Sequence, residues 1–141
     1  MKLSKMIIAL VAMLLGVAHS VSAQVAVVDG ENYASLQEAI AAADGKVVKL
    51  LSDIEVDTKT FTIADGQNVV LDMNNMSITA TDNASGNYEL FYIYGELTVK
   101  GNGTINLAST IDRNWNNMSA IFHNRGGVLT IENGTFINNG G

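Results

Sequence analysis

Apolar residues along this chain follow three patterns in succession. They first form an uninterrupted run over residues 6–17, then recur with the spacing of one helix face over residues 36–43. From residue 46 onward they alternate with polar residues, as they do along half-buried strands. The pattern therefore predicts three parts, namely a leader (1–23), an N-terminal segment with a helix (24–45) and a long β region (46–141).

The leader has the order of a secretory signal peptide. Lys2 and Lys5 precede the apolar run, and Val21 and Ala23 are small residues at the positions that a signal peptidase reads. The run is about a dozen residues long, whereas a helix that spans a membrane needs about 20. The sequence thus predicts cleavage after Ala23 and no stable membrane insertion afterwards. The expected destination is the periplasm, the cell surface or the extracellular medium.

The helical segment carries its own start and stop signals. Ser35 and Glu38 are three residues apart and form a capping box, and Gly45 suits a left-handed position after the last turn. We expect one amphipathic helix over residues 35–44, with an apolar face formed by Leu36, Ala39, Ile40 and Ala43.

The β region repeats one unit, in which a strand, a turn rich in Asn, Asp or Gly, a second strand, a loop and a third strand follow one another. The first strands are expected at 48–50, 69–73, 97–100 and 129–132, the second at 54–56, 76–80, 104–107 and 135–137, and the third at 61–63, 90–94 and 120–122. Such a repeat predicts that each strand pairs with its equivalent one unit later, in three parallel sheets. Two inward columns are expected, Val48, Val69, Leu97 and Leu129 in one, and Leu50, Leu71, Val99 and Ile131 in the other.

This arrangement resembles the N-terminal end of the pectin-lyase-like superfamily over residues 26–141. The residues that carry the resemblance are the cap helix (35–43) and the segments 46–54, 68–74 and 97–103. The resemblance implies an all-β right-handed parallel β-helix with three short strands per coil, whose open N-terminal end is covered by the helix. It implies little about function, because this fold serves lyases, hydrolases, adhesins and other surface proteins.

The C-terminal end carries no second cap. A solenoid needs one at each end, and nothing after Thr135 has the pattern of one. We therefore expect this chain to be a fragment of a longer protein. The alternative is self-association at the open C-terminal coil.

The net charge limits the kinds of binding partner, and the cysteine content excludes disulfides. Removal of Lys2 and Lys5 leaves six basic residues against fourteen acidic ones, a net charge of −8. Such a charge disfavours nucleic acid. The chain has no cysteine, so disulfides do not stabilise it.

Two long loops offer the candidate ligand-binding residues. Residues 81–89 and 109–118 both lie between a second and a third strand, so we expect them to be neighbours. A ring with nearby carboxylates and amides is typical of a sugar-binding surface, and polysaccharide is the expected partner. The candidates are Asp82, Tyr88, Asp112, Arg113, Trp115 and Asn116. In the competing interpretation, Trp115 covers an apolar edge of the coil instead.

No catalytic constellation is evident. Asp53, Asp65, Asp72 and Asp82 are scattered over different turns, and His123 is isolated and expected in a turn or on the surface. No cofactor is expected, and Ca²⁺ would enter only if the chain were part of a lyase. Two hypotheses remain. One is a secreted or surface β-helix module that binds carbohydrate or serves as an adhesin-like structural protein. The other is the N-terminal piece of a polysaccharide lyase or glycoside hydrolase.

Overall fold

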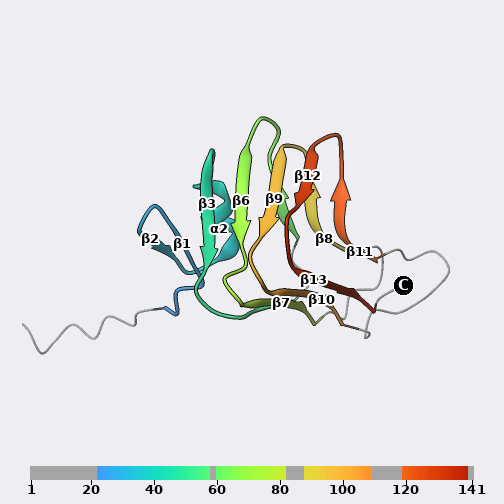
Figure 1. Ribbon diagram of the computed structural model, residues 1–141, viewed down its shortest axis with the longest axis horizontal. Helices are drawn as coiled ribbons and strands as arrows, with labels where there is room; N and C mark the ends of the chain where they lie inside the picture. The colour runs from blue at the N-terminus through green and yellow to red at the C-terminus, as the bar shows by residue number, and fades with distance from the viewer. Residues whose placement is uncertain (1–21, 58–59, 82–87, 109–118, 140–141) are drawn as a thin grey trace, which may run out of the picture.

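The computed structural model describes residues 22–57, 60–81, 88–108 and 119–139, which are mostly β structure (Figure 1). The first elements are β1 (Ala26–Val28), β2 (Glu31–Tyr33), α2 (Leu36–Ala41), β3 (Lys46–Leu50), β4 (Ile54–Val56), β5 (Phe61–Ile63) and β6 (Asn68–Asp72). The others are β7 (Ser77–Ala80), β8 (Tyr88–Ile93), β9 (Glu96–Lys100), β10 (Thr104–Leu107), β11 (Ser119–Asn124), β12 (Val128–Ile131) and β13 (Thr135–Asn138). Within these described residues, no helix has the length and apolar character needed to cross a membrane.

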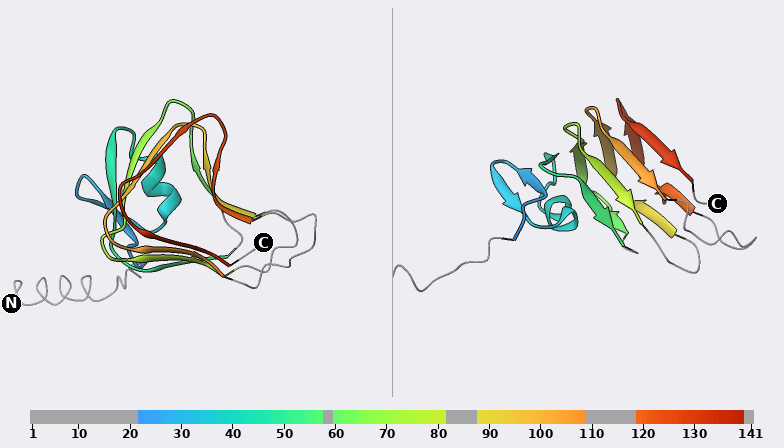
Figure 2. Two further views of the ribbon diagram at one scale, coloured as in Figure 1. Left: turned by 45° about the vertical axis from the view of Figure 1, so that its right-hand side comes forward. Right: turned by 90° about the horizontal axis from the view of Figure 1, so that it is seen from below.

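The strands form three sheets that surround an apolar interior (Figure 2). The first sheet has the order β12-β9-β6-β3-β1-β2, the second β13-β10-β7-β4 and the third β11-β8-β5. From β3 onward the chain visits the first, second and third sheets in turn and then returns to the first. Each strand pairs in parallel with the equivalent strand of the next unit. The predicted strand order and parallel pairing are therefore confirmed.

The predicted register between the first strands of successive units is confirmed except between β3 and β6. Leu97 pairs with Val69 and with Leu129, as expected. Val48, however, pairs with Leu71 and not with Val69, so the first unit is two residues longer than predicted. A slip of two residues keeps every side chain on its original face. The alternation of apolar and polar residues could not detect this difference.

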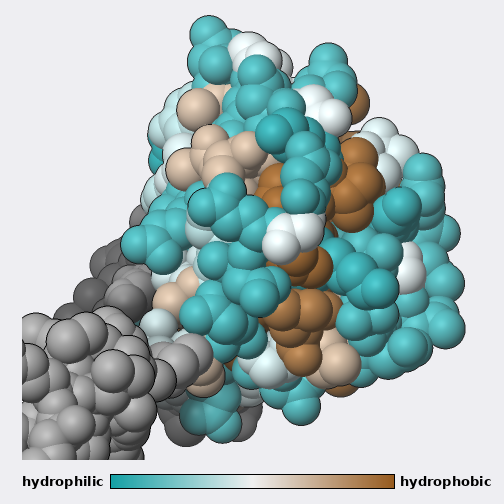
Figure 3. Space-filling model, turned by 90° about the vertical axis from the view of Figure 1, so that its left-hand side faces the viewer, coloured by the Kyte–Doolittle hydropathy of each residue, from teal (hydrophilic) through white to brown (hydrophobic). Residues whose placement is uncertain are grey.

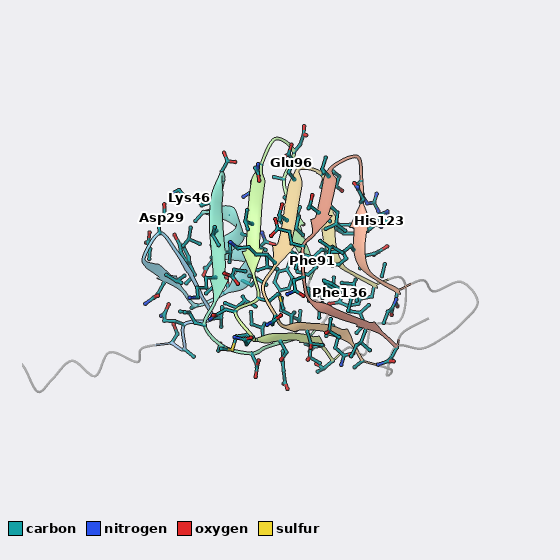
Figure 4. The ribbon with its side chains drawn as sticks, viewed as in Figure 1. Asp29, Lys46, Phe91, Glu96, His123 and Phe136 are labelled. Atoms are coloured by element: carbon teal, nitrogen blue, oxygen red, sulfur yellow. The ribbon has the colours of Figure 1, made fainter. Side chains whose placement is uncertain are left out.

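Phenylalanine rings stack along the interior. Phe61, Phe91 and Phe122 occupy paired positions on β5, β8 and β11, and the centroid of the Phe91 ring lies 5.3 Å from that of Phe61 and 5.5 Å from that of Phe122. Phe136 on β13 adds an edge contact with Phe122 at 5.5 Å, so the ladder joins the second and third sheets. The side chains of Phe91 and Phe136 both lie in the space that the sheets enclose (Figure 4). Because Phe91 is fully buried, it contributes strongly to the core.

The helix begins as predicted and ends early. Ser35 is the N-cap, and its hydroxyl accepts a hydrogen bond from the Glu38 amide at 3.2 Å. The expected apolar face is buried. The last helical residue is Ala41, because the amide of Ala43 bonds to the carbonyl of Ile40, three residues back, and this tightens the chain. Gly45, with φ +68°, belongs to the turn that leads into β3.

A hairpin that the sequence analysis did not predict extends the first sheet. Asp29 and Gly30 connect β1 to β2 with φ values of +49° and +83°, a backbone suited to a tight hairpin turn. β1 then pairs antiparallel with β3, with Ala26 opposite Leu50. The helix packs against this hairpin and β5. The described surface at this end is mostly hydrophilic around a hydrophobic band (Figure 3).

Candidate functional site

Most of the candidate residues from the sequence lie outside the described residues, namely Asp82, Asp112, Arg113, Trp115 and Asn116. Tyr88 is the first residue of β8, and only 4 % of it is exposed. It belongs to the enclosed part of the structure and does not offer a free ring face. The strands that flank the two loops are neighbours, since Ala80 pairs with Leu107 and Tyr88 with Ser119.

A groove of about 420 Å³ lies at the corner where the chain turns from the third sheet into the first. Three successive units contribute one turn each. The lining residues are Asp65, Gly66, Gln67, Asn68, Tyr94, Gly95, Glu96, Gly126, Gly127 and Val128. A second hollow of about 480 Å³ adjoins it and shares Asp65, Gly66 and Gln67 with it.

Glycines allow the turns at this corner to stack closely. A Cβ atom on Gly95 would collide with the carbonyl oxygens of Ala64 and Gln67, and one on Gly127 would collide with the carbonyl oxygen of Gly95. Any other residue at these positions would push successive turns apart. Because four of the lining residues are glycines, backbone atoms form much of the groove surface.

The side chains at the groove differ in how firmly they are held. Gln67 is fixed, because its Nε2 donates to the Ile40 carbonyl at 2.6 Å and its Oε1 accepts from the Ala64 amide at 3.1 Å. Asn68 Nδ2 donates to Glu96 Oε2 at 3.2 Å, and Glu96 lies at the start of β9 (Figure 4). Tyr94 is 40 % exposed. The groove therefore combines a fixed amide, carboxylates and an accessible aromatic ring.

A network of polar side chains lies beside the groove, on the outer face of the third sheet. Tyr92 OH donates to Glu89 Oε2 at 2.9 Å, and His123 Nδ1 lies 3.2 Å from Glu89 Oε1. Figure 4 shows His123 on β11. The Arg125 guanidinium lies over the Tyr92 ring, 4.9 Å from its centroid, at cation–π distance. The Tyr94 ring is 6.5 Å from that of Tyr92, which connects the network to the groove.

Glu89 controls the ionisation of Tyr92. The hydrogen bond to Glu89 raises the pKa of the phenol above its ordinary value of 10.0, and partial burial and the charge of Glu89 act in the same direction. Arg125 opposes this shift weakly. The raised pKa extends the pH range in which the phenol is neutral and can donate a hydrogen bond to Glu89.

The sequence analysis did not find this network. His123 was expected to be isolated, but it pairs in register with Tyr92 and contacts Glu89. Matching the third strands on Phe91 and Phe122 places the next residues, Tyr92 and His123, side by side. That alignment of the third strands is the signal that could have revealed the contact.

No cluster suited to a metal ion appears among the described residues, where three or more His, Cys, Asp or Glu side chains never gather. Two carboxylates at these hollows, Asp44 in the second and Glu96 in the groove, accept hydrogen bonds from amides instead. Asp44 accepts from the backbone amide of Asn68 at 3.1 Å, and Glu96 accepts from its side chain. What the groove offers to a ligand is therefore hydrogen bonding, negative charge and ring stacking.

Comparisons with protein-family models, curated proteins and solved structures found no match to this chain. The resemblance to the pectin-lyase-like superfamily therefore rests on the pattern of residues alone.

Proposed function

We propose that the mature chain is an exported, right-handed parallel β-helix module of the pectin-lyase-like type that binds carbohydrate in the groove beside Tyr94. The parallel pairing of every unit with the next supports the β-helix. Right-handed connections are the rule between parallel strands of one sheet. The signal-like leader, 1–23, supports export.

The observation that carries the binding proposal is the exposed ring of Tyr94 at a groove with a backbone surface. An aromatic face packs against the apolar face of a sugar ring, and nearby polar groups bind its hydroxyls. Here those groups are Asp65, Asn68 and Glu96, which come from two successive units. These residues lie in a turn or at the first position of a paired strand, so no flexible loop has to lose conformational entropy when the ligand binds.

The alternative, a piece of a polysaccharide lyase or glycoside hydrolase, is favoured by one observation. His123 Nδ1 lies 3.2 Å from a Glu89 carboxylate that is only 13 % exposed, while the imidazole itself is 39 % exposed. A carboxylate that orients a histidine in this way is a common arrangement for proton transfer. The hydrogen bond from Tyr92 to the same carboxylate holds it in position.

Tyr94→Ala tests the proposed function. We first screen the mature chain, 24–141, against an array of oligosaccharides and then measure the affinity for the best ligand by calorimetry. The variant should weaken binding about tenfold, because the stacking ring is lost. Ile137→Ala is the matched control, since Ile137 is 39 % exposed on the second sheet, and it should bind as the unchanged chain does.

Three outcomes would contradict the proposal. Absence of binding to every oligosaccharide would favour a purely structural, adhesin-like module. Full affinity in the Tyr94→Ala variant would place the binding site elsewhere. Shortening of the bound oligosaccharide during the measurement, abolished by His123→Ala, would favour the enzyme.

A further inference from the structure

The charge of the residues that line the groove indicates which kind of carbohydrate it binds. This inference rests on the carbohydrate-binding function proposed above. We propose that the ligand is a linear glycan with free amino groups, which are positively charged when protonated, and that acidic glycans are rejected. Carboxylates line the two adjoining hollows, and the cations on adjacent segments contact other residues.

Carboxylates line both hollows. Asp65 belongs to both, Glu96 to the first and Asp44 to the second. Among the described residues that line either hollow, there is no Lys, Arg or His. A uronate or sulfate in this groove would therefore meet like charge, while an ammonium group would find the carboxylates of Asp44, Asp65 and Glu96 as counter-charges.

The partners of these carboxylates leave their charge unbalanced. Asp44 Oδ1 accepts from the backbone amide of Asn68 at 3.1 Å, and Glu96 Oε2 accepts from the Asn68 side chain at 3.2 Å. Both donors are neutral amides. They hold two carboxylates in place and do not cancel their charge, so the negative potential remains available to a cationic ligand.

Two cations that lie close in sequence to lining residues, Arg125 and Lys46, make their contacts with residues outside both hollows. Arg125 precedes Gly126 of the groove, but its guanidinium lies over the Tyr92 ring at 4.9 Å. Lys46, at the start of β3, forms an ion pair with Asp29 at 3.0 Å. The net charge of −8 for the mature chain acts in the same direction as the groove.

The shape of the site suits a chain of sugars better than a single one. The two hollows measure about 420 and 480 Å³ and join at Asp65, Gly66 and Gln67. Tyr94 lies in the first hollow only, so one sugar ring can stack there while the next units extend toward Asp44 in the second.

The test compares three oligosaccharides of equal length by calorimetry on the mature chain. They are a fully deacetylated chito-oligosaccharide, its N-acetylated form and an oligogalacturonate. The deacetylated form should bind about tenfold more tightly than the N-acetylated one, the acidic form should not bind, and added salt should remove most of the difference. Glu96→Gln should weaken binding of the deacetylated form about threefold more than it weakens binding of the N-acetylated form, because only the deacetylated form loses a charge interaction. Glu132→Gln, at an exposed carboxylate outside the two hollows, should change neither.

The outcomes separate this inference from the proposed function. Equal affinity for the deacetylated and N-acetylated forms, or tighter binding of the acidic form, would overturn the choice of an amino glycan and keep a carbohydrate site. Binding of none of the three, with none on the array either, would overturn both. Oligolysine serves as a further probe. If it binds as tightly as the amino glycan and Tyr94→Ala weakens neither, the groove is a surface for cationic peptides and the inference fails.

Discussion

At the scale of single residues, the outer face of the third sheet concentrates interactions on one carboxylate. Glu89 accepts from Tyr92, contacts His123 and is only 13 % exposed. Its backbone carbonyl also accepts from the Thr60 hydroxyl at 2.7 Å, which ties β8 to the segment before β5. Because Tyr92 and His123 both contact the carboxylate, its removal should affect both of them.

Tyr92 should therefore ionise at a higher pH than an ordinary tyrosine. Its raised pKa means that the neutral phenol stabilises the fold below pH 10.0, and that this contribution is lost as the pH rises through the raised value. The difference between the absorbance titrations of the unchanged chain and of Tyr92→Phe isolates this residue. Glu89→Gln should lower the pKa toward 10.0, because the principal cause of the shift is removed.

Glu55→Gln provides the control for that titration, because Glu55 is exposed on β4 of the second sheet. It should leave the Tyr92 titration unchanged. If Glu89→Gln also leaves it unchanged, the hydrogen bond to Glu89 does not determine the ionisation of Tyr92.

At the scale of elements, the corner turns decide how closely successive units stack. The amide of Glu96 bonds to the Gln67 carbonyl at 2.8 Å, and the amide of Val128 bonds to the Gly95 carbonyl at 2.9 Å. These bonds continue the ladder of the first sheet around the corner. They require the close approach that Gly95 and Gly127 permit.

Gly95→Ala should consequently destabilise the fold by about 2–3 kcal/mol, since its methyl group would collide with two backbone oxygens that cannot rotate away. The free energy of unfolding in urea measures this effect. Gly45→Ala is the matched control. Gly45 has φ +68° and open space around it, so only backbone strain of about 1 kcal/mol is expected there. An equal loss in the two variants would show that close stacking is not the cause.

At the scale of the whole molecule, the three sheets present different surfaces. The third sheet and its corner with the first carry the polar network and the groove, and the phenylalanine ladder holds the second and third sheets together behind them. At β12 and β13, Val128, Ile131 and Ile137 are 54 %, 48 % and 39 % exposed. The equivalent of Ile131 one unit earlier, Val99, is fully buried. The first sheet therefore exposes at β12 an apolar position that its inner strands bury.

The export that we propose for this chain can be tested directly. When the full chain is produced in a bacterial host, mass spectrometry of the exported protein should show Gln24 as its first residue. Ala23→Leu should block this cleavage, because a large side chain does not fit the site that a signal peptidase reads.

Ser22→Leu is the control for that experiment, since its position between Val21 and Ala23 does not need a small residue. It should be cleaved normally. Export of the unchanged chain with residues 1–23 still attached would contradict the assignment of the signal peptide.

Features that depend on residues close together in the chain could be predicted from the sequence alone. The alternation of apolar and polar residues located every strand from β3 onward, and Ser35 located the start of the helix. The Asp29–Gly30 turn was also readable in principle, because this pair favours the hairpin that joins β1 and β2. Each of these signals acts over a few residues and survives without its tertiary partners.

The contacts between residues of different units became visible only in the folded molecule. A strand pattern with a period of two is unchanged by a slip of two residues, so it could not choose between Val69 and Leu71 as the partner of Val48. The contact of Glu89 with His123 joins residues 34 apart in the sequence, and the groove unites three turns from different units. These arrangements follow from the stacking of whole units, in which backbone pairing and core packing must be satisfied at the same time. A pattern of a few neighbouring residues contains no information about which units stack or in which register.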